Sequence, residues 1–359
     1  MTALFQPLTI REVNFKNRIF LSPMCQYSAK DGMPNDWHMV HLGSRAVGGA
    51  SLVMVEATAV TPAGRISPAD LGLWNDEQME AFKPIVRFIK GQGAVPAIQL
   101  AHSGRKGSTD IPWQGGKPLS PGDGGWIPVA PSAIPFDQGY ATPIALDQDG
   151  LDGIRRAFQE AAKRAYAAGF EVIEIHMAHG YLLHEFLSPF SNQRSDAYGG
   201  SLANRMRFPL EVTECIREVW PSHLPLFVRI SASDWKEGGW DIHQSVELAK
   251  RLKALNVDLI DCSSGGILPD VLPEAKPNYQ VPFAEQIKKE AEMLTGAVGL
   301  ITETEQANAI VADSKADAVL IGRAFLRDPY WALHAALALH IEQDWPKHYQ
   351  RAFATEFLR

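Results

Sequence analysis

The chain has 359 residues, of which 46% are hydrophobic and 21% are charged, and its formal net charge is −7. This composition is that of an ordinary globular protein with material for a large core. The acidic balance argues against nucleic acid or an anionic membrane as the main partner, because both select a basic surface. Three scattered cysteines, no apolar run of transmembrane length and no signal-peptide pattern predict a cytoplasmic protein.

Short apolar runs recur along the chain, separated by longer segments with helical spacing. Eight of these runs are predicted to be strands, namely Arg18–Met24, Ser51–Val60, Ala94–His102, Phe170–His179, Leu224–Ser231, Val257–Ser264, Ala297–Thr302 and Asp317–Arg323. The intervening stretches, such as Gln148–Gly169 and Ile242–Asn256, carry apolar residues at helical spacing. Eight alternating βα units favour an α/β fold, a single-domain (β/α)8 TIM barrel over residues 1–359. A doubly wound sheet is the alternative.

Two segments do not fit the repeat. Gly104–Tyr140 is rich in Gly, Pro and Trp and is too long for an ordinary βα loop, so residues 104–140 are predicted to form an excursion over the barrel mouth after the third strand. Residues 345–359 follow the eighth unit and are predicted to form a C-terminal tail.

Polar residues stand where the predicted strands end, which is where a barrel of this type gathers its chemistry. In chain order they are Met24, Cys25, Tyr27, Ala57 with Thr58, Gln99, His102, His176, His179, Tyr181, Arg229, Ser263, Ser264, Gly322 and Arg323. Arg229 is the hardest of them to explain structurally, because a guanidinium inside an apolar strand needs an anionic or acceptor partner. The pair Gly322–Arg323 is typical of a phosphate site after the last strand.

Two histidines three residues apart, His176 and His179, end the fourth run. They could bind zinc with His102 as a third ligand, although a hydrolytic site usually also has a carboxylate and none stands at a neighbouring strand tip. The other hypothesis is a pair of hydrogen-bond donors that hold a carbonyl or anionic oxygen.

Motifs over nearly the whole chain resemble the old yellow enzyme family, the flavin-dependent ene-reductases. The resemblance includes NRIFLSPMCQYSA, IQLAHSGRK, FVRISASDW and IGRAFLRDPYW, and its most specific part is GFEVIEIHMAHGYLLHEFLSPFSNQRSDAYGGSLANR. The chain carries a cysteine, Cys25, after the first strand. In this respect it resembles the short bacterial subclass that includes the xenobiotic reductases.

The resemblance implies a barrel that binds FMN tightly but non-covalently at its mouth, with NADPH or NADH as the reductant. The residues it assigns to the cofactor are Ser22, Pro23, Met24, Cys25, Ala57, Gln99, Arg229, Gly322 and Arg323, together with the backbone of residues 298–302. Gln99 would pair with the pyrimidine edge of the flavin. Arg229 would lie near the N1/C2 region, so that the cofactor is the partner of its charge. Cys25 would tune the redox behaviour of the flavin.

The resemblance also implies the reaction. His176 and His179 would hold the carbonyl oxygen of an α,β-unsaturated acceptor, Tyr27 would orient it, flavin N5 would deliver hydride to the β-carbon, and Tyr181 would donate the proton. Enones, enals, nitro compounds and quinones all suit such a mouth. A zinc-dependent hydrolase using His102, His176 and His179 is the alternative. In the Cys-containing subclass a C-terminal Arg can enter the neighbouring subunit's site, which suggests Arg351 and a homodimer or homotetramer.

Overall fold

Eight parallel strands form a closed barrel. The computed structural model describes residues 2–343 and 345–353. Around the barrel, the strand order is β3–β4–β5–β8–β9–β10–β11–β12. The strands are β3 (Ile19–Leu21), β4 (Leu52–Ala59), β5 (Val95–Ala101), β8 (Val172–Met177), β9 (Leu226–Ser231), β10 (Leu259–Ser263), β11 (Leu294–Val298) and β12 (Ala318–Ile321). The (β/α)8 prediction is confirmed, and the doubly wound alternative is wrong.

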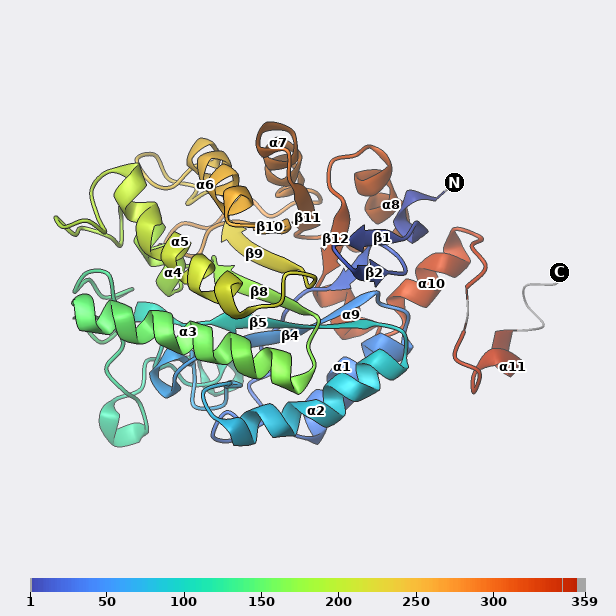
Figure 1. Cartoon of the computed structure of the whole chain (residues 1–359), viewed down its shortest axis with the longest axis horizontal. Coiled ribbons are helices and arrows are strands. Elements are labelled where there is room, and N and C mark those ends of the chain that lie inside the picture. The colour runs from blue at the N-terminus through green and yellow to red at the C-terminus, as the bar shows by residue number, and fades with distance from the viewer. Residues whose placement is uncertain (1, 344, 354–359) are drawn as a thin grey trace.

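Helices surround the strands (Figure 1). They are α1 (Asp36–Val47), α2 (Asp76–Gly91), α3 (Gln148–Ala168), α4 (Leu182–Leu187), α5 (Leu202–Val219), α6 (Ile242–Ala254), α7 (Val281–Ala291), α8 (Thr304–Ala312), α9 (Arg323–Arg327), α10 (Trp331–Ala338) and α11 (Gln350–Phe353). Helix α3 begins after Asp147, whose carboxylate accepts a hydrogen bond from the Gly150 amide. It ends at Gly169 with φ +94°, a conformation that favours glycine. The predicted helices over 148–169 and 242–256 are confirmed.

The strands are buried on both faces, which explains why they read as continuous apolar runs rather than as alternating ones. Every residue of β4 is buried. The seventh strand is the one misplaced prediction: it was expected at Ala297–Thr302, but β11 spans Leu294–Val298. Gly299 and Leu300 follow with φ of +109° and +49°, so the chain turns there. The apolar residues after Val298 therefore belong to a loop.

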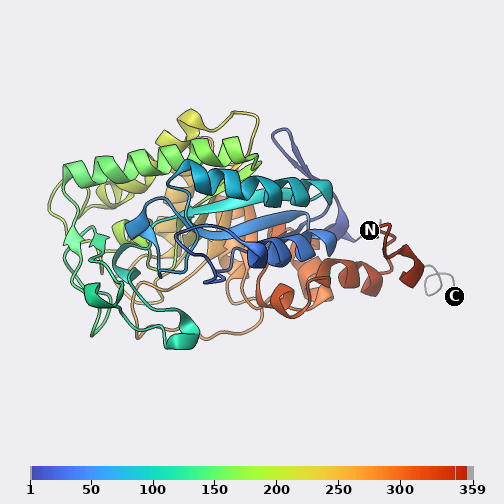
Figure 2. The same cartoon turned by 90° about the horizontal axis from the view of Figure 1, so that it is seen from below.

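The segment after β5 lies at one end of the barrel, opposite the end where the chain termini lie (Figure 2). It contains short turns of 3-10 helix, η3 (Gly104–Lys106), η4 (Pro112–Gln114) and η5 (Pro121–Asp123). Its two-residue strand β6 (Val129–Ala130) pairs in parallel with β7 (Ile144–Ala145). Because this segment leaves the carboxyl end of β5, that end of the molecule is the barrel mouth.

A hairpin of β1 (Leu8–Ile10) and β2 (Val13–Phe15) precedes the barrel. Phe15 brings its ring within 5.0 Å of the Phe20 ring on β3 and within 6.4 Å of the Phe227 ring on β9. All three rings are fully buried. Aromatic clusters of this kind contribute strongly to the stability of a core.

The C-terminal tail stands apart from the barrel helices, with α11 at the far edge of the molecule from the excursion (Figure 1). The Tyr349 ring lies 6.2 Å from the Tyr330 ring, which precedes α10. The predicted tail falls partly outside the described residues. Within the described part of the chain, no helix combines the length and apolar character needed to cross a bilayer.

We predict that Phe15→Ala lowers the free energy of unfolding by about 3–5 kcal/mol, because it leaves a cavity in the three-ring cluster. Urea denaturation followed by circular dichroism measures this. Thr9→Ala on the exposed face of β1 is the matched control and should change stability by less than about 0.5 kcal/mol. Equal effects of the two substitutions would contradict a structural role for the ring cluster.

Candidate active site

The loop after β3 carries Ser22 to Tyr27 to the barrel mouth, where Pro23, Met24, Cys25 and Tyr27 are half-buried. Glu56 anchors this loop, because its Oε1 accepts a hydrogen bond of 3.0 Å from the Gln26 amide. Glu56 lies at a bulge of β4, between Val55 and Ala57. The sequence reasoning gave Glu56 no such role, although an acid inside an apolar run was a usable signal.

Cys25 and Tyr27 lie in a setting that keeps both protonated. Burial raises the pKa of the Cys25 thiol well above its usual value, and the carboxyl groups of Asp70 and Glu56 add to the shift. Burial likewise raises the pKa of Tyr27 above its usual range. The Tyr27 ring contacts the Trp113 ring of the excursion edge-on, with centroids 6.0 Å apart. Cys25 therefore stands at the mouth as a thiol, not as a nucleophilic thiolate.

Gln99 of β5 and Arg229 of β9 both find partners inside the barrel. The Gln99 amide donates to Glu174 Oε1 of β8 at 2.7 Å. Arg229 Nη1 donates to Ser22 Oγ at 3.2 Å. Arg229 Nε lies 3.1 Å from Asp261 Oδ2 of β10, close enough for an ion pair. Asp261 thus faces the Arg229 charge across the strand register, and the assignment of Arg229 to the cofactor stays a prediction.

Several polar atoms of this cluster remain available to a further group. Arg229 Nε, Glu174 Oε2 and both carboxylate oxygens of Asp261 are buried without a hydrogen bond among the described residues. Burial raises the pKa of Glu174 to about 8 and that of Asp261 to about 6, while Arg229 opposes both shifts. At neutral pH, Glu174 is therefore largely protonated beside Gln99.

His176 and His179 lie close together, and one ring nitrogen of each faces the other. His176 Nδ1 accepts a hydrogen bond of 3.1 Å from the Ala178 amide, so the proton of its neutral ring lies on Nε2. His179 Nε2 lies 2.7 Å from Ser263 Oγ of β10. His176 Nε2 and His179 Nδ1 face each other at 3.4 Å, close enough for a hydrogen bond between the two rings. His179 Nδ1 is a second N–H donor when its Nε2 accepts from Ser263 Oγ.

Both imidazoles are held neutral. Burial lowers the pKa of His176 and His179 well below the usual value, and the nearby Arg229 guanidinium lowers both further. Neutral rings can donate to an oxygen without carrying a charge into the site.

Tyr181 completes this group and is fixed by the start of α4. Its ring meets the His176 ring edge-on, with centroids 5.0 Å apart. Burial raises the pKa of the Tyr181 phenol well above its usual value, and the nearby Cys25 and Tyr27 side chains raise it further. His184 anchors the loop from below, because its Nδ1 accepts from the Gly180 amide and its Nε2 contacts Asp234 Oδ1 at 3.0 Å. The sequence reasoning did not assign His184 or Asp234.

A hollow of about 260 Å³ lies where β11 and β12 end. Its lining includes Gly299, Gly322, Arg323 and Arg327. The Arg323 side chain is exposed and has no ion-pair or hydrogen-bond partner among the described residues. Two glycines and free guanidinium groups suit a phosphate.

The metal alternative gains no support. His102 is buried, and its Nδ1 accepts a hydrogen bond from the Gly104 amide. Among residues 2–343 and 345–353, no three His, Cys, Asp or Glu side chains come together in a way that could hold a metal ion. Nothing in the described chain therefore favours a zinc site.

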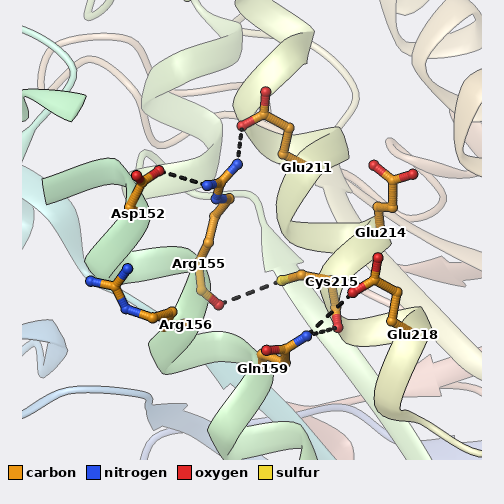
Figure 3. Close-up of a pocket in the computed structure, with 8 residues that line it drawn as sticks. All are labelled: Asp152, Arg155, Arg156, Gln159, Glu211, Glu214, Cys215 and Glu218. Carbon is orange, nitrogen blue, oxygen red and sulfur yellow. Dashed lines mark hydrogen bonds and ion pairs between the residues drawn. The ribbon is translucent and has the colours of Figure 1, made fainter. Parts of the chain in front are cut away.

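Two further features lie away from the mouth. A polar hollow of about 300 Å³ opens between α3 and α5 (Figure 3). Its Arg155 already pairs with Asp152 and Glu211, and the Cys215 thiol donates to the Arg155 carbonyl. None of the predicted site residues lines it. Arg351 is exposed in α11, at the far edge of the molecule from the excursion, so the structure does not bring it to the mouth of its own barrel.

Comparisons with known proteins identify the family of the chain. Residues 3–342 match the NADH:flavin oxidoreductase / NADH oxidase family. The NADPH dehydrogenase of Bacillus cytotoxicus is 47% identical over 353 residues, which is 98% of this chain and 97% of that protein. The NADPH dehydrogenase of Bacillus subtilis is also 47% identical, over 98% of this chain and 99% of its own length.

Solved structures show the same architecture. Morphinone reductase in complex with tetrahydroNAD superposes with a TM-score of 0.78 at 28% identity, over 95% of this chain and 92% of that one. The old yellow enzyme homologue from Zymomonas mobilis gives a TM-score of 0.77 at 27% identity, over 95% and 94% of the two chains. The chain therefore belongs to the NADH:flavin oxidoreductase / NADH oxidase family and is an NAD(P)H-dependent flavin oxidoreductase of the old yellow enzyme type.

Proposed function

We propose that this protein is an ene-reductase, which uses FMN and NAD(P)H to reduce the activated C=C bond of α,β-unsaturated carbonyl compounds. The observation that carries the proposal is the convergence of His176 Nε2 and His179 Nδ1, 3.4 Å apart, beside the Tyr181 ring. When Ser263 Oγ donates to His179 Nε2, both facing nitrogens carry a proton, and two neutral N–H donors this close suit a single carbonyl oxygen.

The residues at the mouth fit FMN bound without a covalent link. Gln99 donates its amide to Glu174, which leaves its carbonyl oxygen free to accept from the flavin pyrimidine edge. Arg229, whose Nη1 reaches Ser22 Oγ at the start of the loop after β3, would place its guanidinium near the carbonyl at the flavin N1/C2 region. Arg323, Gly322 and the backbone after β11 would hold the phosphate. The Ser22–Cys25 loop and Ala57 would line the ring system.

Bound FMN supplies hydride chemistry, taken from NAD(P)H and passed to an electron-poor alkene. The chain's own residues then have defined tasks. His176 and His179 bind the acceptor oxygen and stabilise the negative charge that develops on it, because their donors are already oriented before the reaction. Tyr27 orients the acceptor from the opposite loop. Cys25, held as a thiol, lies beside the flavin ring and influences its redox behaviour.

Tyr181 is proposed to give the proton to the α-carbon of the acceptor. Its raised pKa keeps the phenol protonated across the neutral range, so the proton is present when the acceptor binds. A high pKa also makes the phenol a weak acid, so proton transfer depends on charge building up on the acceptor carbon.

The mouth suits small enones and enals, and nitro compounds or quinones offer similar electron-poor groups. The curated relatives are named for NADPH, which supports NADPH as the reductant. Arg351 of a neighbouring copy is proposed to reach the site, because α11 lies away from its own barrel mouth.

Flavin content tests the proposal first. The purified protein should be yellow, and its absorbance should bleach in the absence of oxygen when NADPH is added and return when an enone is added. Anaerobic absorption spectra measure both steps. A protein that carries no flavin and takes up none on incubation with FMN would contradict the proposal.

Tyr181→Phe separates the two halves of the reaction. It removes the proton donor and keeps the ring, so enone reduction should slow by about 100-fold or more, the scale of a lost general acid. Flavin reduction by NADPH should stay within about threefold. Stopped-flow absorbance follows each half-reaction. Equal slowing of both halves would rule out the proton-donor role.

The protonation state of His176 and His179 tests whether they can act as neutral hydrogen-bond donors to the acceptor oxygen. Because burial lowers the pKa of His176 and His179 well below 6.5, both rings should stay neutral as the pH falls through 6.5. Nuclear magnetic resonance of histidine-labelled protein follows this, with His176→Gln and His179→Gln for assignment. The denatured chain is the control, since its histidines titrate near pH 6.5. Native rings that titrate there would contradict the neutral-donor account.

A further inference from the structure

Lys106 joins two loops at the barrel mouth. Its Nζ donates to the His179 carbonyl at 2.8 Å and to the Gly266 carbonyl at 3.0 Å. We propose that Lys106 is a positioning residue, which clamps the loop carrying His179 and Tyr181 against the loop after β10 and so sets where the acceptor is held. The inference rests on the proposed function, because the clamp matters to catalysis only if these side chains hold the acceptor.

The two loops meet backbone against backbone, with no room for a side chain between them. A Cβ on Gly180, whose φ is +75°, would lie 2.1 Å from the Gly266 carbonyl oxygen. A Cβ on Gly266 would in turn lie 2.7 Å from His179 backbone atoms. His179 itself has φ +60°, a conformation that is unfavourable for a non-glycine residue. Two contacts from outside the loop hold it: the His179 amide donates to Ser231 Oγ at 2.9 Å, and the His179 carbonyl accepts from Lys106 Nζ.

Lys106 is suited to that task by its surroundings. The Phe136 ring of the excursion lies 4.6 Å from Nζ, and the Tyr181 ring lies 5.3 Å from it. One ammonium group thus contacts three segments, the excursion, the β8–α4 loop and the loop after β10. Both cation–π contacts add to the attraction that holds Nζ in place.

The charge of Lys106 also matters to the histidines. Burial lowers the pKa of Lys106 to about 8, and the carboxyl group of Glu185 opposes the shift. The amine therefore remains mostly protonated at pH 7. After burial and Arg229, its charge is one of the influences that lower the pKa of His176 and His179. Lys106 thus adds to the neutral state of the two donors, which burial and Arg229 mainly determine.

Arg105 offers a matched control next in the chain. It is also a buried cation, and its Nη2 donates to the Ile267 carbonyl at 2.7 Å, one residue beyond Gly266. It contacts the same Phe136 ring, at 5.8 Å. Within the described chain, the Arg105 side chain forms no hydrogen bond with His179 and no cation–π contact with Tyr181. Arg105 therefore packs in the same region as Lys106 but does not join the two loops that Lys106 clamps.

Hydrogen exchange of the purified protein, read by mass spectrometry, tests the clamp. Lys106→Met keeps the length of the side chain and removes its donors, so amides of residues 178–182 should exchange at least about tenfold faster than in the parent protein. Arg105→Met should leave exchange of residues 178–182 within about threefold. Unchanged exchange of this segment in Lys106→Met, or equal acceleration in both variants, would overturn the proposal.

Ligand binding gives the functional half of the test. A para-substituted phenol is the probe, because its oxygen can accept hydrogen bonds from His176 and His179 as a carbonyl oxygen would. The affinity of flavin-loaded Lys106→Met for this phenol should fall by about tenfold or more, equivalent to about 1.4 kcal/mol. Its rate of flavin reduction by NADPH should stay within about threefold of the parent rate. Lys106→Gln, which retains amide donors, should recover part of the affinity and serves as the second variant if Lys106→Met does not fold. No recovery, or equal loss in the binding and reduction measurements, would overturn the positioning role.

The two measurements separate the clamp from the proposed function. Hydrogen exchange needs no acceptor, so it reports on the loop alone. Failure of the proposed function would show as absent phenol binding in the parent protein, whereas failure of the clamp would show as slow exchange in Lys106→Met.

Discussion

Closure of the barrel by eight parallel strands is the constraint on which the site depends. Because all eight run in one direction, their carboxyl ends meet at one end of the molecule and bring side chains from distant parts of the chain together. Ser22 touches Arg229 across more than half the chain length. His176 lies beside Arg229 in the register of β8 and β9. A change in strand order or register would separate the acceptor-binding donors from the proposed cofactor residues.

Desolvation then determines what these side chains can do. Inside the mouth, an imidazole gains little by taking a proton beside Arg229 and Lys106, so the histidines remain neutral donors. The carboxyl groups respond in the opposite direction, and Glu174 becomes a largely protonated partner of Gln99. Cations beneath and beside a proposed site for an electron-rich cofactor favour negative charge there. Burial of these polar side chains disfavours folding, and it also determines which of them are charged and which are neutral.

The sequence predicted the barrel because its strands are buried on both faces and therefore form uninterrupted apolar runs. It misplaced β11, since Leu294–Gly296 is less apolar than the loop residues Leu300 and Ile301. The catalytic candidates were found because polar groups at strand ends stand out from such runs. The partners of these residues were not found from the sequence. Asp261 pairs with Arg229 through the strand register, and Lys106 binds the His179 carbonyl through loop packing, and the spacing of residues along the chain reveals neither contact. Single-chain patterns indicate which residues leave the core, but not what they contact.

The central claim is that His176 and His179 jointly hold one oxygen of the acceptor beside Tyr181. A crystal structure of the flavin-loaded protein with a para-substituted phenol tests it most directly. The account predicts the phenol oxygen within hydrogen-bond distance of both His176 Nε2 and His179 Nδ1, with the ligand ring parallel to the flavin. A phenol oxygen bound elsewhere in the mouth, or to only one of the two nitrogens, would contradict it.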